Sequence, residues 1–165
     1  METLIAYGTK YGATEKAAKM LAEKIEGPVT LMNLKEKNQK KMDLTKFDVI
    51  AVGGSIYAGK IQKEVQDFCS ENEELLLTKR LGLFLCCGNE DLVEDQLATS
   101  FSNKLLDQTA AKSHFGYEFD FEKMNFLSRM IVKKISKVNE SKFQINEENI
   151  HAFAKVLNQI NVHEI

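Results

Sequence analysis

Short apolar segments bounded by glycine or polar turns alternate along the chain with longer segments in which apolar residues recur every three or four positions. Consecutive apolar side chains are typical of strands that are buried on both faces of a parallel sheet. The segment after Gly27-Pro28 carries polar interruptions, which places it at an edge of the sheet. Strands are predicted at Thr3–Tyr7, Val29–Leu34, Phe47–Val52, Leu81–Cys87 and Lys112–Phe119.

The longer segments between these strands have the spacing of amphipathic helices, in which one apolar face packs on the sheet. Alternation of strands and helices indicates a parallel sheet with helices on both faces, and right-handed crossovers leave few arrangements. We predict a five-stranded doubly wound α/β sheet in the order 2-1-3-4-5. The helices are expected at Ala13–Ile25, Lys60–Asn72, Leu92–Asp107 and Glu148–Ile160.

Length and composition fit one globular domain, residues 1–165, with a net charge of −2. That charge gives no indication of nucleic-acid binding. No apolar run approaches the roughly 20 residues that span a bilayer, and Thr3–Tyr7 is too short for a secretory signal. Cys69, Cys86 and Cys87 form a poor disulfide framework and lack metal-site spacing. We therefore expect a cytoplasmic protein with reduced thiols and no metal, and Cys86 as a small core residue.

In a doubly wound sheet, ligands bind beyond the carboxyl ends of the strands, beside the first strand. The first loop at that edge is Gly8–Thr14, which combines hydroxyls and glycines with the start of a helix. Free N–H groups at a helix start attract anions, so the loop can hold a phosphate without any arginine or lysine. The alternative is an ordinary helix start, in which Thr9 or Thr14 caps the helix and nothing binds.

The second loop, Gly53–Lys60, contains three glycines, and Tyr57 offers a ring that can stack on a flat cofactor or can simply cover the sheet end. The third loop, Cys87–Asp91, can present its backbone to a polar heterocycle or form a plain turn in which Asp91 caps the next helix. No catalytic side chain is predicted, because the three histidines lie outside these loops. The histidines are His114, His151 and His163.

Two of these loops resemble those of a known family. The first is similar to the phosphate loop of flavodoxins, Thr/Ser-x-Thr-Gly-x-Thr: Thr9, Gly12 and Thr14 match, and Tyr11 replaces the middle hydroxyl. The run from Val52 to Glu64 resembles the flavodoxin-like protoporphyrinogen dehydrogenases, whose stretch reads Gly-Gly/Ala-Ser-Ile/Val, then a Gly, then Lys or His and a helix. The resemblance covers nearly the whole chain.

This resemblance implies FMN as the cofactor, with its phosphate on the first loop and its isoalloxazine ring between the second and third loops. It also implies that the flavin does the chemistry while the protein holds and tunes it. The implied cofactor-binding residues are Thr9, Lys10, Tyr11, Gly12, Ala13, Thr14, Ser55, Ile56, Tyr57, Ala58, Gly59, Cys87, Gly88, Asn89 and Glu90.

The segment Phe121–Val138 is basic and amphipathic. It carries five cations and one carboxylate, a local charge of +4, and on a helical wheel its apolar residues share a stripe. Such a helix can rest on an anionic membrane through Lys123–Lys137, meet an acidic partner or substrate, or pack on the domain with solvated lysines. The predicted stripe consists of Met124, Leu127, Ile131, Ile135 and Val138.

Three functions are compatible with these patterns. Lys10 and Lys60 beside the flavin loops favour a high flavin potential, and hence a dehydrogenase that passes electrons from a porphyrinogen-like substrate to a quinone or another acceptor. A flavodoxin that carries single electrons between protein partners is the alternative. A domain that kept the fold and lost the cofactor is the third.

Overall fold

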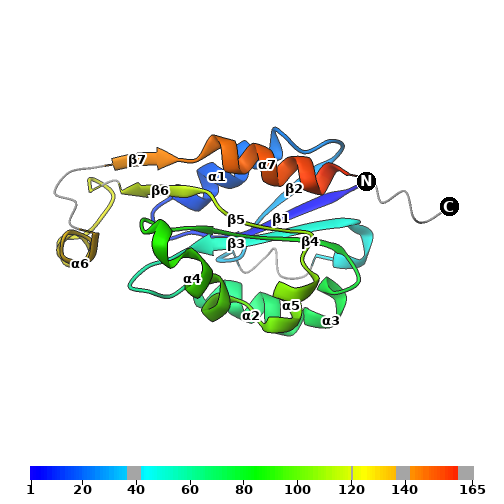
Figure 1. The fold of residues 1–165 in the computed structure, drawn as a ribbon, viewed down its shortest axis with the longest axis horizontal. Coiled ribbons are helices and arrows are strands. Elements are labelled where there is room, and N and C mark those ends of the chain that lie inside the picture. Colours follow the sequence, from blue (N-terminus) through cyan, green and yellow to red (C-terminus); the bar gives the residue numbers. More distant parts are fainter. Residues whose placement is uncertain (37–41, 120, 137–141, 160–165) are drawn as a thin grey trace.

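A computed structural model describes residues 1–36, 42–119, 121–136 and 142–159. Its central layer is a five-stranded parallel sheet in the order β2-β1-β3-β4-β5, as the sequence predicted (Figure 1). The carboxyl ends of the inner strands are aligned, because Gly8 on β1 pairs with Gly54 on β3 and Ser55 pairs with Cys86 on β4. The strands are β1 (Thr3–Gly8), β2 (Val29–Asn33), β3 (Val49–Ser55), β4 (Arg80–Cys86) and β5 (Ala111–His114).

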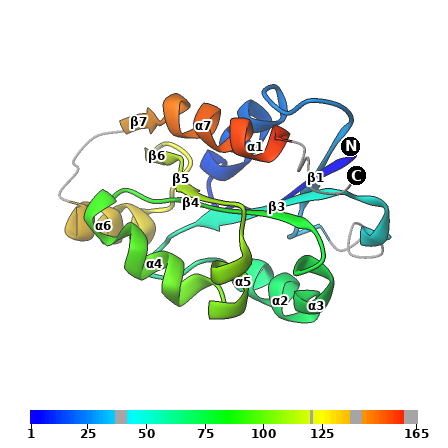
Figure 2. The same ribbon diagram turned by 45° about the vertical axis from the view of Figure 1, so that its right-hand side comes forward.

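Helices cover both faces of the sheet, as Figures 1 and 2 show. On one face lie α1 (Ala13–Ala22) and α7 (Glu147–Asn158). The other face carries α2 (Lys63–Glu71), α3 (Glu73–Leu76), α4 (Val93–Ser100) and α5 (Asn103–Gln108), with the short 3-10 turns η2 (Leu44–Lys46) and η3 (Glu90–Leu92) in the connections.

Each face of the sheet has its own hydrophobic core, because successive strand residues point to opposite sides. Under α1 and α7, three fully or almost fully buried rings form the centre: Phe84 stacks on Phe115 at 4.6 Å between centroids, and Phe153 meets both edge-on. On the other face, Leu83 of β4 packs with Val65 of α2 in the second core. Burial on both faces explains why the inner strands are almost wholly apolar in sequence.

The strand predicted at Lys112–Phe119 is wrong as a single element. β5 ends at His114, and the chain then bends at Gly116, whose φ of 78° is open mainly to glycine. A Cβ at Gly116 would also lie 2.0 Å from the Gln144 carbonyl oxygen. Beyond the bend, β6 (Gly116–Phe119) pairs antiparallel with β7 (Lys142–Ile145), a strand that the sequence did not predict.

All four predicted helices have different bounds in the structure. The segment Leu92–Asp107 is broken because Phe101 is extended and the Ser102 hydroxyl caps α5 by accepting from the Leu105 amide. The helix predicted from Lys60 begins at Lys63, after a tight turn. α1 ends at Ala22 rather than at residue 25, and α7 ends at Asn158, while residue 160 lies outside the described residues.

The basic segment forms α6 (Phe126–Ser136), but its buried side is not the predicted stripe. Met124 of the predicted stripe is buried, but Leu127 of that stripe is 68% exposed, and Val132, which is not in the stripe, is buried. Lys137 and Val138 lie outside the described residues. Figure 1 shows α6 beyond the carboxyl edge of the sheet, next to the ribbon formed by β6 and β7. None of the described helices is long and apolar enough to cross a membrane.

Packing at Gly53 on β3 leads to a test of the core. A Cβ at this position would lie 2.4 Å from the Phe84 ring, which is itself stacked on Phe115 and has no room to retreat. We expect Gly53→Ala to lower the free energy of unfolding by about 1–3 kcal/mol, measured by urea denaturation. In a protein that also carries Phe84→Leu, which removes the obstructing ring, Gly53→Ala should lower the free energy of unfolding by clearly less. An equal cost in both backgrounds would contradict this account.

Candidate functional site

The three loops predicted from the sequence meet at the carboxyl edge of the sheet and line one cavity. β6 and α6 supply its remaining wall. Eight of the predicted site residues line it: Lys10, Tyr11, Ala13, Ser55, Ile56, Tyr57, Cys87 and Gly88. The structure adds Cys86, Tyr117, Glu118, Met124 and Val132 to the lining.

The first loop leaves the start of α1 open to an anion. Its N-cap is Gly12, with a φ of 98°, so neither Thr9 nor Thr14 caps the helix. The Thr9 hydroxyl instead accepts a hydrogen bond of 3.0 Å from the Gly12 amide, which fixes the turn and leaves its O–H free to donate. The first amides of α1 have no intrahelical partner and no side-chain cap.

Thr14 strengthens this anion site. Its side chain is fully buried, and its hydroxyl has no nitrogen or oxygen partner among the described residues. The hydroxyl faces the Cys86 thiol, whose pKa burial raises to about 12 although Thr14 opposes the shift. A thiol is a weak hydrogen-bond partner, so an oxygen of a ligand that reached this helix terminus would bind the hydroxyl better.

The second loop is a tight turn that presents Tyr57. The amide and carbonyl of Tyr57 pair with those of Lys60 at 2.9 and 3.1 Å, and the two residues between them have φ values of 49° (Ala58) and 77° (Gly59). Two consecutive left-handed residues are typical of a type I′ turn. At the base of the loop, Gln62 accepts from the Ser55 amide at 2.9 Å and donates to its hydroxyl at 2.5 Å.

Two tyrosines and a lysine of the cavity lining contact one another. The rings of Tyr11 and Tyr57 meet edge to face, with centroids 6.1 Å apart. Lys10 places its Nζ 3.2 Å from the Tyr57 ring centroid, a cation–π contact between the first and second loops. The site therefore holds a fixed positive charge beside aromatic surface.

α6 and the segment just before it supply part of the cavity wall. Phe121, Met124 and Val132 form a small hydrophobic cluster against which Tyr11 and Tyr57 pack. The Tyr11 hydroxyl donates to the buried Ser128 hydroxyl at 2.5 Å. This bond joins the first loop to a segment more than a hundred residues later in the chain.

The third loop is held by its own side chains. Asn89, rather than the predicted Asp91, caps the turn after β4, because its side chain accepts from the Asp91 amide. Glu90 lies 3.3 Å from the His114 ring, so His114 sits beside this loop, contrary to the prediction that the histidines lie apart from it. His151 lies on α7 and is exposed, and His163 lies outside the described residues.

The cysteines at the cavity are not activated. Burial raises the pKa of Cys86 to about 12 and that of Cys87 to about 11, so both thiols stay protonated at neutral pH. The described residues contain no cluster of His, Cys, Asp and Glu that could hold a metal ion.

Seven predicted site residues shape the loops without lining the cavity: Thr9, Gly12, Thr14, Ala58, Gly59, Asn89 and Glu90. Sequence reasoning missed the lining from β6 and α6. A signal for α6 was present in its amphipathic pattern, whereas Tyr117 and Glu118 enter the site only because the chain bends at Gly116.

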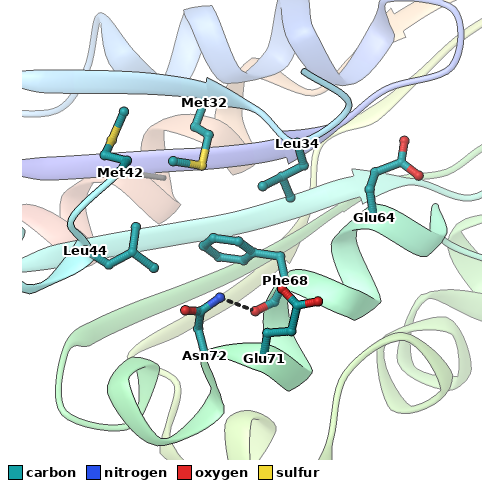
Figure 3. A pocket seen from close by; sticks show the side chains of 8 residues that line it. All are labelled: Met32, Leu34, Met42, Leu44, Glu64, Phe68, Glu71 and Asn72. Atoms are coloured by element: carbon teal, nitrogen blue, oxygen red, sulfur yellow. Dashed lines mark hydrogen bonds between the residues drawn. The ribbon is translucent and has the colours of Figure 1, made fainter. Parts of the chain in front are cut away.

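A second hollow lies between β2 and α2 (Figure 3). Its wall is mostly apolar, with Met32 and Phe68 at its centre, and its rim carries the carboxylates of Glu64 and Glu71. The hydrogen bond drawn there, from Asn72 to the Phe68 carbonyl, lies within one turn at the end of α2. Two carboxylates repel an anionic ligand, so this hollow does not compete for a phosphate.

Comparison with known proteins agrees with this arrangement. A family model described as a flavodoxin domain matches residues 4–146. The chain belongs to the flavodoxin family. Members of this family bind FMN. No curated protein sequence matches the chain.

Solved structures of flavodoxins share the fold. Oxidised flavodoxin 2 from Bacillus cereus is 18% identical with a TM-score of 0.61, and the match covers 95% of this chain and 97% of that one. A flavodoxin from Streptococcus pneumoniae is 16% identical with a TM-score of 0.55, over 95% of this chain and 97% of the other. Rubredoxin oxygen:oxidoreductase from Desulfovibrio gigas is 17% identical with a TM-score of 0.62, over 95% of this chain but only 35% of the enzyme, so this chain spans about a third of its length. Likeness at these identities shows the fold alone.

The open helix start gives a prediction for the flavin that this family binds. Thr14→Val keeps the side-chain shape and removes the buried hydroxyl, so FMN affinity should fall by about 1.5–3 kcal/mol, roughly 10- to 150-fold. The affinity is measured by titrating FMN with the protein and following the quenching of flavin fluorescence.

Thr3→Val is the matched control, because Thr3 also has a buried hydroxyl but lies at the amino end of β1. The Thr3→Val variant should bind FMN with the same affinity as the unaltered protein. Equal affinities for all three proteins would place the phosphate elsewhere.

Proposed function

We propose that this protein is an FMN-dependent oxidoreductase that passes electrons from an organic substrate to a separate acceptor. The observation that carries the proposal is the uncapped start of α1, with the buried hydroxyl of Thr14, next to a cavity lined by Tyr11 and Tyr57. The phosphate would lie on Thr9 and the segment 11–14, and the flavin ring between residues 55–59 and 87–90. These neutral donors and aromatic surfaces fit the two ends of FMN.

A bound FMN supplies the electron-transfer chemistry itself, so the protein needs no nucleophile. The side chains at the site agree with that division of labour. The cavity thiols are protonated, and His114 is engaged with Glu90 and Asn149. The protein's own contribution is to bind, to cover the cavity and to set its charge.

The charge at the cavity supports a dehydrogenase over a low-potential carrier. Lys10 is the cation in the lining, and the carboxylate in the lining, Glu118, lies 3.4 Å from the ammonium of Lys16. A cation beside the ring favours the more negative, reduced form of a flavin and raises its potential, whereas a shell of carboxylates does the reverse. Accepting electrons from a substrate requires the higher potential.

The placement of α6 also supports a small-molecule substrate. A carrier exchanges electrons across an open flavin edge with protein partners, but here Met124 and Val132 cover one side of the cavity. Together with the Gly53–Lys60 run, this supports a reaction of the protoporphyrinogen dehydrogenase type, with a porphyrinogen-like substrate and a quinone acceptor. An electron carrier is the second candidate, favoured by the likeness to flavodoxins that match over their whole length.

The first experiment tests turnover. FMN-loaded protein, mixed without oxygen with protoporphyrinogen IX and menaquinone, is expected to accelerate porphyrin formation, followed by porphyrin fluorescence. The same protein stripped of FMN is the control and should not exceed the blank. If the loaded protein does not accelerate porphyrin formation but exchanges electrons rapidly with a protein donor, the electron-carrier function is favoured. If the purified protein is colourless and cannot be reconstituted with FMN, only the third function remains, a domain that kept the fold and lost the cofactor.

The second experiment measures the flavin potential. Lys10→Met removes the cation from the cavity and should lower the two-electron reduction potential of bound FMN by on the order of 30 mV, which corresponds to about 1.4 kcal/mol. Lys63→Met is the control, because Lys63 is exposed on α2 and paired with Asp67. A potential unchanged by Lys10→Met would show that this cation does not tune the flavin.

A further inference from the structure

The outer face of α6 carries an unusual concentration of exposed apolar side chains. Phe126, Leu127 and Met130 are 79%, 68% and 54% exposed. The other large hydrophobic residues that are exposed in the described part of the chain lie away from α6: Met1 precedes β1 and is 45% exposed, and Leu92 ends η3 and is 44% exposed. Three such residues within one and a half turns form a patch that water solvates poorly.

The orientation of this patch is fixed by the opposite side of the helix. Ser128 and Val132 are buried there, and Ser128 is bonded to Tyr11. At 3.6 residues per turn, Phe126 and Met130 project away from that buried side. Packing on the domain therefore accounts for one face of α6 and leaves the other to solvent.

Cations surround the apolar patch. α6 contains Arg129, Lys133 and Lys134 and no acidic residue, and the two lysines are exposed. Lys123, just before the helix, is exposed as well. The protein as a whole has a net charge of −2, so this positive charge is local. Apolar side chains flanked by lysines match an interface with anionic headgroups above an apolar layer.

We propose that the outer face of α6 docks on an anionic lipid bilayer, with Phe126, Leu127 and Met130 inserted between headgroups that Lys133 and Lys134 contact. Three side chains are too few for a stable protein interface, which buries about 1,600 Å². A second copy would bring the same cations face to face. A bilayer needs neither a large area nor a complementary shape, and each cation near an anionic surface adds roughly fivefold to affinity.

Docking of this kind brings the cavity close to the bilayer, because Val132 on the buried face of the same helix and Met124 just before the helix line the cavity. A lipid-soluble electron acceptor would then reach the site from the membrane. The docking itself does not depend on the proposed redox function, since it uses only side chains on the solvent side of α6.

Vesicle co-sedimentation of the full chain tests this inference. We expect binding to vesicles of phosphatidylcholine and phosphatidylglycerol in equal parts, little binding to phosphatidylcholine alone, and weakening as salt increases. Replacing Phe126, Leu127 and Met130 together by serine should abolish most of the binding. Lys133→Glu with Lys134→Glu should weaken it by about thirtyfold or more.

Control variants carry the same kinds of change elsewhere. Leu92→Ser alters an exposed hydrophobic residue away from α6, and Lys35→Glu with Lys155→Glu makes the same change in net charge at exposed positions away from α6. Both should bind like the unaltered protein, and circular dichroism should show every variant folded. Docking by α6 is ruled out if the α6 variants bind normally, if no vesicle is bound, or if the serine variant instead converts a dimer to a monomer in light scattering.

Discussion

The structure depends on one constraint of parallel sheets: strands that run in the same direction must be joined by crossover connections. Here β2 and β3 lie on opposite sides of β1, so the two connections run in opposite directions along the sheet. The helices that follow β1 and β3 therefore lie on opposite faces of the sheet, and their loops diverge at its carboxyl edge. The divergence opens the crevice in which the three loops meet. Because Gly8 pairs with Gly54 and Ser55 pairs with Cys86, the inner strands end at the same height and their loops start side by side. Every later feature of the site is built on that edge.

The chain then uses α6 twice. Its inner residues Ser128 and Val132, with Met124 just before the helix, contact the cavity residues Tyr11 and Tyr57, while its outer residues contribute to no core of the described structure. A helix that only stabilised the domain would bury its largest apolar residues, yet Phe126 is the most exposed of all the large hydrophobic residues described. The two faces thus differ in what they contact, and a function outside the domain explains the second face better than packing does.

Local sequence patterns predicted most of the strands and helices and about half of the residues that line the cavity. The inner strands were predictable because burial on both faces makes them apolar throughout, and the loops followed from the strand order. The bend at Gly116 was not predictable, because the buried Phe115 continues the strand pattern through it. The register of α6 was ambiguous for a related reason: apolar residues occur around the whole helix from 126 to 132, and contacts with the distant Tyr11 and Tyr57 select the buried side.

The second loop shows how the site departs from the most stable local structure. Ala58 is the one residue other than glycine with a positive φ in the described chain, and such a conformation costs roughly 1–2 kcal/mol. The turn that requires it closes the amide and carbonyl of Tyr57 onto Lys60, which directs the ring toward Lys10. Strain tolerated at a single cavity loop, rather than spread over the surface, is typical of positions that a ligand site over-determines. The strained turn, the aromatic ring and the cation therefore lie together, because the turn between Tyr57 and Lys60 holds the ring that Lys10 contacts.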